Sequence, residues 1–282
     1  MRTLICVVLC VAVTLLTGCT SGGSTPTARP QMQLRWLITA HALHEISAID
    51  SAVARTAFDG ASTFVIRGPA GAGVPSGWNS TLVADYKSYA QLASDLAQGV
   101  FPTGARAVLY DDESWGFTPV EEQRDPSRYI QLAAQLCHQH GLLLIAAPAM
   151  DLTTVLSPNA TSRRAAYLDL GLAAIAARSA DVVDIQAQSL EADSAAYRSF
   201  VTSAAQQARQ AGGARVRLLA GLSTGPSGKT VTAAQLTDAA NATRGVVDGF
   251  WLNVPGQSAE CPTCTQPMPG LAVTVLRALY HL

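Results

Sequence analysis

The sequence predicts an α/β fold in which parallel strands alternate with helices. Two features predict it: short apolar runs rich in β-forming residues recur along the chain, and alanine-rich stretches with helical spacing separate them. The predicted strands are residues 34–40, 63–67, 105–111, 142–147, 182–188, 216–221 and 249–254. Their starts lie 29 to 42 residues apart, which suits a strand, a loop and a helix in each repeat. Several runs are almost entirely apolar, as expected of parallel strands covered on both faces.

The helical stretches carry start and stop signals. Asp125 followed by Pro126 predicts a helix N-terminus, and Gly141 predicts the end of that helix. Between these signals, Ile130 and Cys137 share an apolar face with two alanines, so this face is expected to pack against the sheet and to bury the thiol.

The repeats favour one particular architecture, a (β/α)8 barrel of the TIM type. Residues 31–282 read as one domain because no linker interrupts the alternation, and their 252 residues would hold eight units of about 31. Only seven strands are identifiable, so the eighth is irregular or absent. An open, doubly wound sheet is the alternative architecture.

The N-terminal segment predicts that the protein is located outside the cytoplasm. Residues 1–18 have the features of a secretory signal peptide: Arg2 precedes a 13-residue apolar run over residues 4–16, which is shorter than the roughly 20 residues needed to span a bilayer. Leu16-Thr17-Gly18-Cys19 resembles the bacterial lipobox, whose cysteine is lipidated. Acyl chains such as palmitate on Cys19 would anchor the protein to the cell membrane. The alternative is an ordinary cleaved signal in which the cysteine is incidental.

The segment after Cys19 and the overall composition narrow the class of protein. Residues 19–30 consist almost entirely of Ser, Thr, Gly, Pro and Ala after the cysteine, which predicts a flexible tether. The chain is 49% hydrophobic and can bury a core, and its 19 basic against 20 acidic residues leave a net charge of -1. Without a basic field, nucleic-acid binding is not expected. The sequence does not predict an oligomeric state.

The pair Cys261-Pro-Thr-Cys264 lies among turn-forming residues. Outside the cytoplasm, a disulfide that closes a small loop is the favoured interpretation. A zinc site would require two further ligands, and a thioredoxin-like redox motif would be expected to open a helix.

The candidate catalytic residues are Asp111 and Glu113, at the end of a predicted strand. Residues two apart in a strand face the same side, so these carboxylates point together while Asp112 points away. Two acids this close in a partly dry cleft cannot both ionise freely, and one pKa is expected to rise, as a general acid requires. The alternative is structural: the acids cap the next turn or pair with arginine.

The other strand ends of a barrel supply further candidates, because active residues sit where strands end and loops begin. The predicted substrate-binding residues are Arg67, Trp115, Gln186, Gln188, Trp251 and Asn253. Other polar residues at these positions are Asp151, Asp184, Glu191 and Ser223. Acids, amides and aromatic rings together are typical of sites that bind sugars.

These residues carry a resemblance to a known family. Asp111-Asp112-Glu113 resembles the closing Asp-x-Glu of chitinase-type family 18 glycoside hydrolases, and Trp251 is placed like their floor tryptophan. The resemblance implies that Glu113 is the acid and that Asp111 orients the substrate acetamido group. The wider string Tyr110-Asp111-x-Glu113-x-Trp115-x-x-Thr118-Pro119 is similar to a motif of uncharacterised secreted barrel lipoproteins of actinobacteria.

The chain also departs from the hydrolase pattern. Arg106, Ala107 and Leu109 stand where that family has Asp, Gly and Asp, and the family's Met-x-Tyr pair is missing, with Gln186-Ala187-Gln188 nearby.

Two other motifs favour structural interpretations. Gly221-x-Ser223-x-Gly225 matches a nucleophile elbow, but Pro226 disrupts the helix that should follow, so a serine acyl hydrolase is the less favoured hypothesis. His41, His44 and Glu45 could hold a metal only with ligands that the sequence does not identify. No metal and no cofactor are predicted.

Together these features predict an envelope lipoprotein whose barrel binds a carbohydrate polymer. The catalytic version of this hypothesis adds hydrolysis through Glu113. The alternative is a barrel that binds glycan, or serves as an envelope scaffold, without catalysis.

Overall fold

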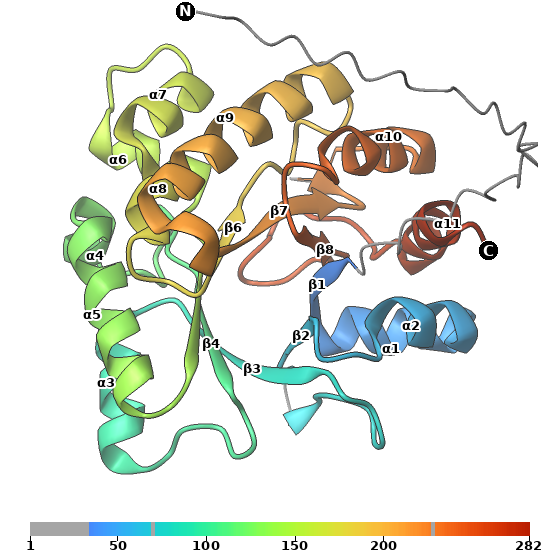
Figure 1. Ribbon diagram of the computed structural model, residues 1–282, viewed down its shortest axis with the longest axis horizontal. Coiled ribbons are helices and arrows are strands. Elements are labelled where there is room, and N and C mark those ends of the chain that lie inside the picture. Colours follow the sequence, from blue (N-terminus) through green and yellow to red (C-terminus); the bar gives the residue numbers. More distant parts are fainter. Residues whose placement is uncertain (1–33, 69–70, 227–228) are drawn as a thin grey trace, which may run out of the picture. The chain divides into compact units, whose positions relative to one another are not determined.

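Eight parallel strands close into a barrel in the computed structural model, which describes residues 34–68, 71–226 and 229–282 (Figure 1). The strands are β1 (Arg35–Thr39), β2 (Thr63–Ile66), β3 (Thr81–Tyr86), β4 (Ala107–Tyr110), β5 (Leu143–Ala146), β6 (Val182–Ile185), β7 (Arg217–Ser223) and β8 (Gly249–Asn253). Each strand pairs with the next, and β8 pairs with β1 to complete the circle. The predicted barrel is confirmed, and the open doubly wound sheet is wrong. The predicted signal peptide, Cys19 and the tether lie outside the described residues.

The strand that the sequence pattern did not reveal is β3, the third along the chain. It begins only 15 residues after the end of β2, and the described part of this link, residues 67–68 and 71–80, forms no α-helix. Its sequence, Thr-Leu-Val-Ala-Asp-Tyr, mixes polar with apolar residues, and Pro75 and Gly77 precede it. The count of seven strands is therefore corrected to eight, because the second repeat lacks the helix that gives the others their length.

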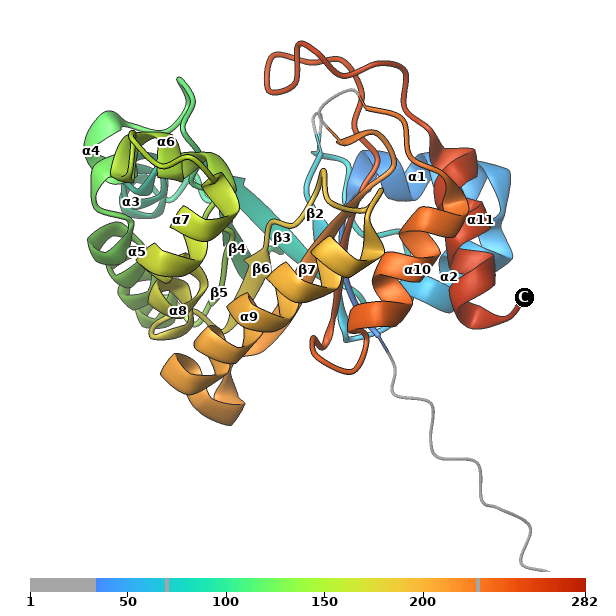
Figure 2. The same ribbon diagram turned by 90° about the horizontal axis from the view of Figure 1, so that it is seen from above.

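The helices surround the strands (Figures 1 and 2). They are α1 (Ala40–Ile49), α2 (Ser51–Phe58), α3 (Tyr89–Gln98), α4 (Val120–Arg124), α5 (Pro126–Gln139), α6 (Thr153–Leu156), α7 (Arg163–Leu170), α8 (Leu172–Ala177), α9 (Ser194–Gly212), α10 (Ala233–Thr243) and α11 (Pro269–Tyr280), with 3-10 turns at Met150–Leu152 and Gly213–Arg215. The predicted cap of α5 is confirmed: the Asp125 carboxylate accepts a hydrogen bond from the Arg128 amide at 3.1 Å. Within the described ranges, no helix combines the length and apolarity that crossing a membrane requires.

The core has two layers, and strand alternation divides residues between them. In β4, Ala107 and Leu109 lie in a cluster inside the barrel, whereas Val108 and Tyr110 lie in the larger cluster between strands and helices. The same alternation turns the next residue, Asp111, toward the inside of the barrel. At the seam, a Cβ on Gly249 would lie 1.9 Å from the carbonyl oxygen of Arg35, so closure of the barrel requires glycine there.

The loop between β8 and α11 stands at one end of the barrel (Figure 2). Cys261 and Cys264 form a disulfide within it, as predicted, and the predicted buried free thiol at Cys137 is also confirmed. The bridge closes a tight turn beside the strand ends, where the candidate site lies.

Candidate functional site

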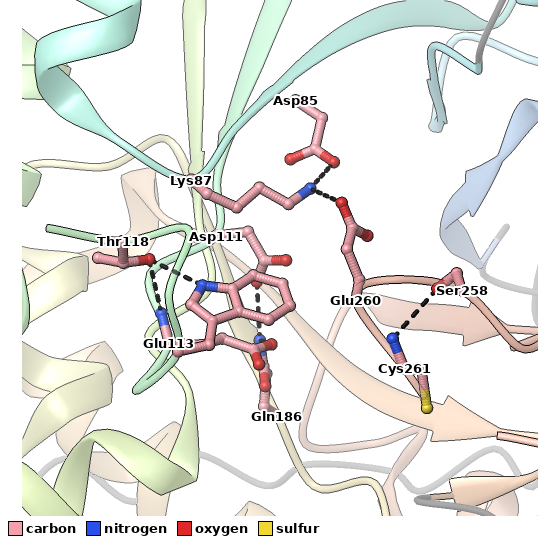
Figure 3. A network of polar contacts seen from close by, with 10 residues as sticks. Asp85, Lys87, Asp111, Glu113, Thr118, Gln186, Ser258, Glu260 and Cys261 are labelled. Atoms are coloured by element: carbon pink, nitrogen blue, oxygen red, sulfur yellow. Dashed lines mark hydrogen bonds and ion pairs between the residues drawn. The ribbon is translucent and has the colours of Figure 1, made fainter. Parts of the chain in front are cut away.

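The carboxylates of Asp111 and Glu113 meet at the amide of Gln186 (Figure 3). Gln186 follows β6, and its Nε2 donates to Asp111 Oδ1 at 2.9 Å, to the Ala147 carbonyl oxygen at 3.1 Å and to Glu113 Oε1 at 3.4 Å. The alanine at the end of the intervening strand β5 is small enough for the amide to reach across to β4. The two acids therefore face the same side, as their spacing predicts.

The loop that carries Glu113 is fixed by side chains from its own sequence and from the next unit. Thr118 Oγ1 accepts a hydrogen bond from the Glu113 amide at 3.4 Å and from Trp115 Nε1 at 2.9 Å. Asp151, after β5, accepts a hydrogen bond from the Ser114 amide at 2.9 Å. The position of the Glu113 carboxylate is thus set by the fold before any ligand binds.

Burial and mutual repulsion change the acidity of this pair. Burial, with repulsion from Glu113 and Asp85, raises the pKa of Asp111 well above its ordinary value. Burial, with repulsion from Asp151, raises the pKa of Glu113 to about 7. A carboxyl group with this pKa is partly protonated at neutral pH and can donate a proton, which is the behaviour expected of a general acid.

A lysine lies among the acids and was not predicted as a site residue. Lys87, just beyond β3, forms ion pairs with Asp85 and with Glu260, whose Oε1 is 3.6 Å from Nζ (Figure 3). Its charge also lowers the pKa of Glu113 against the effect of burial. This group was missed because Asp85 lies on β3 and Lys87 directly after it, and β3 was not recognised as a strand.

Glu260 reaches Lys87 from the disulfide loop. It precedes Cys261, whose backbone amide donates a hydrogen bond to Ser258 Oγ at 3.1 Å (Figure 3). The side chain of Glu260 is half exposed, while that of Lys87 is mostly buried. The loop thus contributes one of the charges around Lys87, and a single sequence carries no pattern that joins residues this far apart in the chain.

Trp251 forms part of the barrel interior beneath the acids. It is 7% exposed and belongs to the inner cluster with Leu37 and Leu109. In the described part of the chain its indole Nε1 has no hydrogen-bond partner. The neighbouring position in register is Gly221, where a Cβ would lie 2.3 Å from Cδ of Gln188, so the Gln188 amide occupies the space above the glycine. The Trp251 ring on β8 and the Gln188 amide, which reaches over β7 from the segment after β6, therefore both lie at the inner face.

The remaining predicted binding residues are less closely associated with the acids. Trp115 is half-buried, and its ring meets that of Phe117 edge to face at 5.1 Å. Asn253 is half-buried at the end of β8, and its carbonyl oxygen accepts a hydrogen bond from the Thr224 amide at 3.0 Å. Arg67 is exposed just after β2. The hydrogen bonds that join the acids to their surroundings include Gln186 but none of these three side chains among the described residues.

Two further buried acids inside the fold lack partners. Asp184, on β6, and Asp112 are fully buried, and neither carboxylate has a hydrogen-bond partner in the described ranges. Burial raises the pKa of each to about 8. A group with this pKa is mostly protonated at pH 7. Asp184 lies two residues before Gln186 on the inward side of its strand.

The motif around Ser223 is structural. Its backbone amide donates to Glu191 Oε1 at 2.9 Å, and its Oγ accepts a hydrogen bond from the Gly225 amide at 3.3 Å. Over the described ranges no histidine hydrogen-bonds to Ser223, and the next helix, α10, begins only at Ala233. The nucleophile elbow requires an immediate helix and a base, so this geometry does not form one.

The histidines do not assemble a metal site among residues 34–68, 71–226 and 229–282, where no cluster of three or more metal-binding side chains occurs. His41 lies 3.6 Å from Glu45 on the exposed side of α1. His138 contacts Asp181 at 2.9 Å, at the end of α5.

Comparisons with known proteins define the class as a TIM barrel. No protein-family model and no curated protein matches the chain. The structure is similar to a chitinase from Chromobacterium violaceum, with a TM-score of 0.51 and 13% identity over 87% of this chain and 99% of that one. The resemblance to actinobacterial lipoproteins is therefore unsupported by a sequence match and stays a prediction.

Two other solved structures have the same architecture at lower similarity. One is a curdlan-specific exo-beta-1,3-glucanase from Blastomyces gilchristii, with a TM-score of 0.47 and 12% identity over 90% of this chain and all (100%) of that one. The other is a triosephosphate isomerase from Bartonella henselae, with a TM-score of 0.43 and 12% identity over 88% and 99% of the two chains. At such identities these similarities concern the fold alone.

Proposed function

We propose that the end of the barrel that carries Asp111 and Glu113 binds a carbohydrate chain and hydrolyses one of its glycosidic bonds. The observation that carries the proposal is the contact of both carboxylates with one amide, at 2.9 and 3.4 Å, in a buried setting that raises the pKa of Glu113 to about 7. Structural acids can also share a hydrogen bond, but they are normally satisfied by several donors and seldom retain a proton near neutral pH.

In the proposed reaction Glu113 is the proton donor. Its carboxyl proton passes to the glycosidic oxygen as the bond from that oxygen to the anomeric carbon breaks. A water molecule then adds its hydroxide to the anomeric carbon and returns a proton to the Glu113 carboxylate. Gln186 donates to the carboxylate and Lys87 lowers its pKa, so both stabilise the anion that remains after proton transfer.

Sugar recognition would use the inner face beneath the acids. The amides of Gln186 and Gln188 offer donors and acceptors, and Trp251, which is only 7% exposed, forms the apolar floor beneath them. The family resemblance assigns Asp111 to the acetamido group of an N-acetylhexosamine. Because the barrel is similar to that of a chitinase, oligomers of N-acetylglucosamine are the first substrates to test.

The cellular location of the protein is also part of the proposal. We propose that Cys19 is acylated and holds the barrel to the outer face of the cell membrane, on the support of the 13-residue apolar run and the Leu16-Thr17-Gly18-Cys19 string. Metabolic labelling with a fatty acid should mark the wild-type protein and leave Cys19→Ala unlabelled. An unlabelled wild-type protein would show that the anchor is wrong.

The test of catalysis compares Glu113→Gln with Glu121→Gln, an exposed glutamate on α4. On oligomers of N-acetylglucosamine and on cell-envelope glycans, Glu113→Gln should lower turnover by about 10²- to 10⁴-fold and leave affinity nearly unchanged. Trp251→Ala should weaken binding first, since it removes contact area. Glu121→Gln should match the wild type.

Two outcomes would contradict the proposal. Binding without cleavage, with Glu113→Gln indistinguishable from the wild type, would replace the enzyme by a glycan-binding or scaffold barrel. Neither binding nor cleavage on any glycan would exclude the sugar hypothesis as a whole.

A further inference from the structure

A cavity of about 710 Å³ lies beside the acid pair, between the end of β3, the first turns of α3 and the loop before α4. Its walls include Asp85, Lys87, Gln91, Asp95 and Phe117. Asp85 and Lys87 form an ion pair beside Asp111 (Figure 3), and both charges act on the Asp111 carboxylate, so the cavity adjoins the candidate catalytic site. Its volume falls within the range of small-ligand sites, about 300 to 1,000 Å³.

One wall presents an aromatic ring that the fold holds in the open. Phe117 is 48% exposed, although it is a large apolar residue. The loop is held from beneath by the largely buried Gln123, whose Nε2 donates to the carbonyl oxygens of Trp115 at 2.8 Å and Thr118 at 2.7 Å. The Phe117 ring is thus positioned by fixed neighbours and still offers free apolar surface, which a ligand with a flat apolar face can cover.

Another part of the lining presents polar groups of defined orientation. Tyr86 donates its hydroxyl hydrogen to Asp95 Oδ2 at 2.9 Å, and Gln91 Nε2 donates to Asp95 Oδ1 at 2.5 Å. Asp85 pairs through Oδ2 with Lys87, and its buried Oδ1 has no hydrogen-bond partner among the described residues. Oδ1 itself is covered, but the Asp85 side chain is 24% exposed at its other atoms, so the carboxylates of Asp85 and Asp95 are the acceptors that this part of the lining presents. Hydroxyl groups are donors of the required kind.

The charges on this part of the lining disfavour an anionic ligand. The start of α3 would normally attract an anion, but Glu122 already accepts hydrogen bonds from the amides of Tyr89 at 2.7 Å and Ala90 at 3.2 Å. Asp85 and Asp95 add negative charge that only Lys87 offsets among the residues lining the cavity. The ligand that fits is therefore neutral, rich in hydroxyl groups on its edges and apolar on one face.

We propose that this cavity is a second sugar subsite, which binds a neutral pyranose unit of the same chain whose glycosidic bond lies at Glu113. The proposal rests on the proposed function for its ligand class. The unit stacks on Phe117 and donates its hydroxyl hydrogens to Asp85 and Asp95, with Gln91 as a further hydrogen-bonding group. Longer oligomers then bind more tightly than a disaccharide, because they fill both subsites.

The experiment measures affinity for a hexamer and a dimer of N-acetylglucosamine and of β-1,3-linked glucose by calorimetry, in the full-length protein and in a Glu113→Gln background that prevents cleavage. Phe117→Ala and Gln91→Ala should each lower the ratio of hexamer to dimer affinity by about 3- to 10-fold, the effect of one aromatic contact or one hydrogen bond. Val120→Ala is the matched control, since Val120 is 51% exposed on the neighbouring helix α4 and does not line the cavity. Replacing the neutral hexamer by one that contains uronic acids should weaken binding.

The possible results separate the subsite from the proposed function. If the wild type cleaves glycans and both variants keep its hexamer-to-dimer ratio, the subsite is wrong and the hydrolase stands. If the ratio of hexamer to dimer affinity falls in the variants while the wild type never cleaves a glycan, the subsite stands and the hydrolase is wrong. Equal binding of neutral and uronic-acid oligomers would overturn the subsite's neutral specificity, and an absence of glycan binding would overturn both proposals.

Discussion

Glu122 and Asp111 are buried acids eleven residues apart, and the fold treats them in opposite ways. Glu122 is 1% exposed and accepts hydrogen bonds from four donors: Ser88 Oγ, the amides of Tyr89 and Ala90, and the Tyr110 hydroxyl. Asp111 is 6% exposed, and its side chain accepts one hydrogen bond among the described residues, from Gln186. One acid joins β4 to the start of α3, whereas the other faces the inside of the barrel with most of its hydrogen-bonding capacity unused.

The difference distinguishes acids that hold the fold together from acids that the fold leaves without internal partners. Four donors satisfy the Glu122 carboxylate and fix the position of a helix, so its ligands are all internal. The inner acids Asp111, Glu113 and Asp184 have few or no internal donors, and burial raises the pKa of all three. Retaining such groups costs stability, which is the usual mark of a site kept for function.

The largest effect is expected when the structural acid is removed. Glu122→Ala leaves the Tyr110 hydroxyl and two helix amides without their acceptor and should lower the free energy of unfolding by about 3 kcal/mol or more. Glu121→Ala, on the exposed side of the same helix, should cost less than about 1 kcal/mol. Urea unfolding monitored by circular dichroism measures both. A loss below 1 kcal/mol for Glu122→Ala would remove the basis of the comparison.

The unpartnered acids should make stability depend on pH. Burial raises the pKa of Asp112 and of Asp184 from 3.8 to about 8. Between these values the unfolded chain has lost protons that the folded protein retains, so stability should be greatest below about pH 4 for these groups and should fall as the pH rises toward 8. Each acid contributes at most about 1.4 kcal/mol per pH unit.

Asp184→Asn tests this expectation with little change in shape. The variant should lose one acid's share of the slope between pH 4 and 8 and should therefore gain stability relative to the wild type as the pH rises. Asp169→Asn, at an exposed position on α7, is the control and should keep the wild-type slope. Parallel curves for Asp184→Asn and the wild type across this range would mean that Asp184 is ionised in the folded protein.

The fold could be predicted because its signals are local. Apolar strands recur at regular intervals, and caps such as Asp125 mark helix ends. The strand β3 escaped detection because it follows β2 without an intervening helix and because its Asp85 interrupts the apolar pattern. That interruption is itself the signal: an acid two residues before Lys87 on the inner side of a strand belongs to the site.

The site could be predicted only in part for a related reason. Asp111 and Glu113 are two residues apart just beyond the end of β4, so their spacing predicted that they face the same side, although Glu113 lies on the loop and is held there by the contacts of that loop and by Gln186. Gln186 could be named as a strand-end residue, but its contact with them depends on the curvature of three strands, β4 to β6. The ion pair from Lys87 to Glu260 joins two segments 173 residues apart in the sequence, and only the closed barrel makes them neighbours.

The disulfide loop allows a test with an intermediate effect. The bridge joins residues three apart and closes a very short loop, so Cys261→Ser with Cys264→Ser should lower stability by no more than about 2 kcal/mol. Thiol counting on the denatured, unreduced mature protein, which lacks residues 1–18 and with them Cys6 and Cys10, should find Cys137 free and Cys261 and Cys264 unreactive, apart from Cys19 where it is unmodified. Two additional reactive thiols would contradict the bridge, and a loss well above 2 kcal/mol would show that the loop supports the barrel.

The smallest effect on stability is expected for Glu260→Gln, because Glu260 is 54% exposed and its pair with Lys87 is open to solvent on one side. Such pairs contribute about 0 to 1 kcal/mol. Its effect on chemistry should be more informative, because Glu260 is one of the charges that raise the pKa of Glu113. A general acid acts while protonated, so removing this charge should move the alkaline limb of the kcat/KM profile toward lower pH. Glu121→Gln changes an exposed residue on α4 that forms no ion pair with Lys87 among the described residues, so it should leave the limb in place. If the alkaline limb of Glu260→Gln moves toward higher pH or stays fixed, Glu260 does not raise the pKa of Glu113. The acidity of the pair would then depend only on residues at the strand ends and not on the disulfide loop.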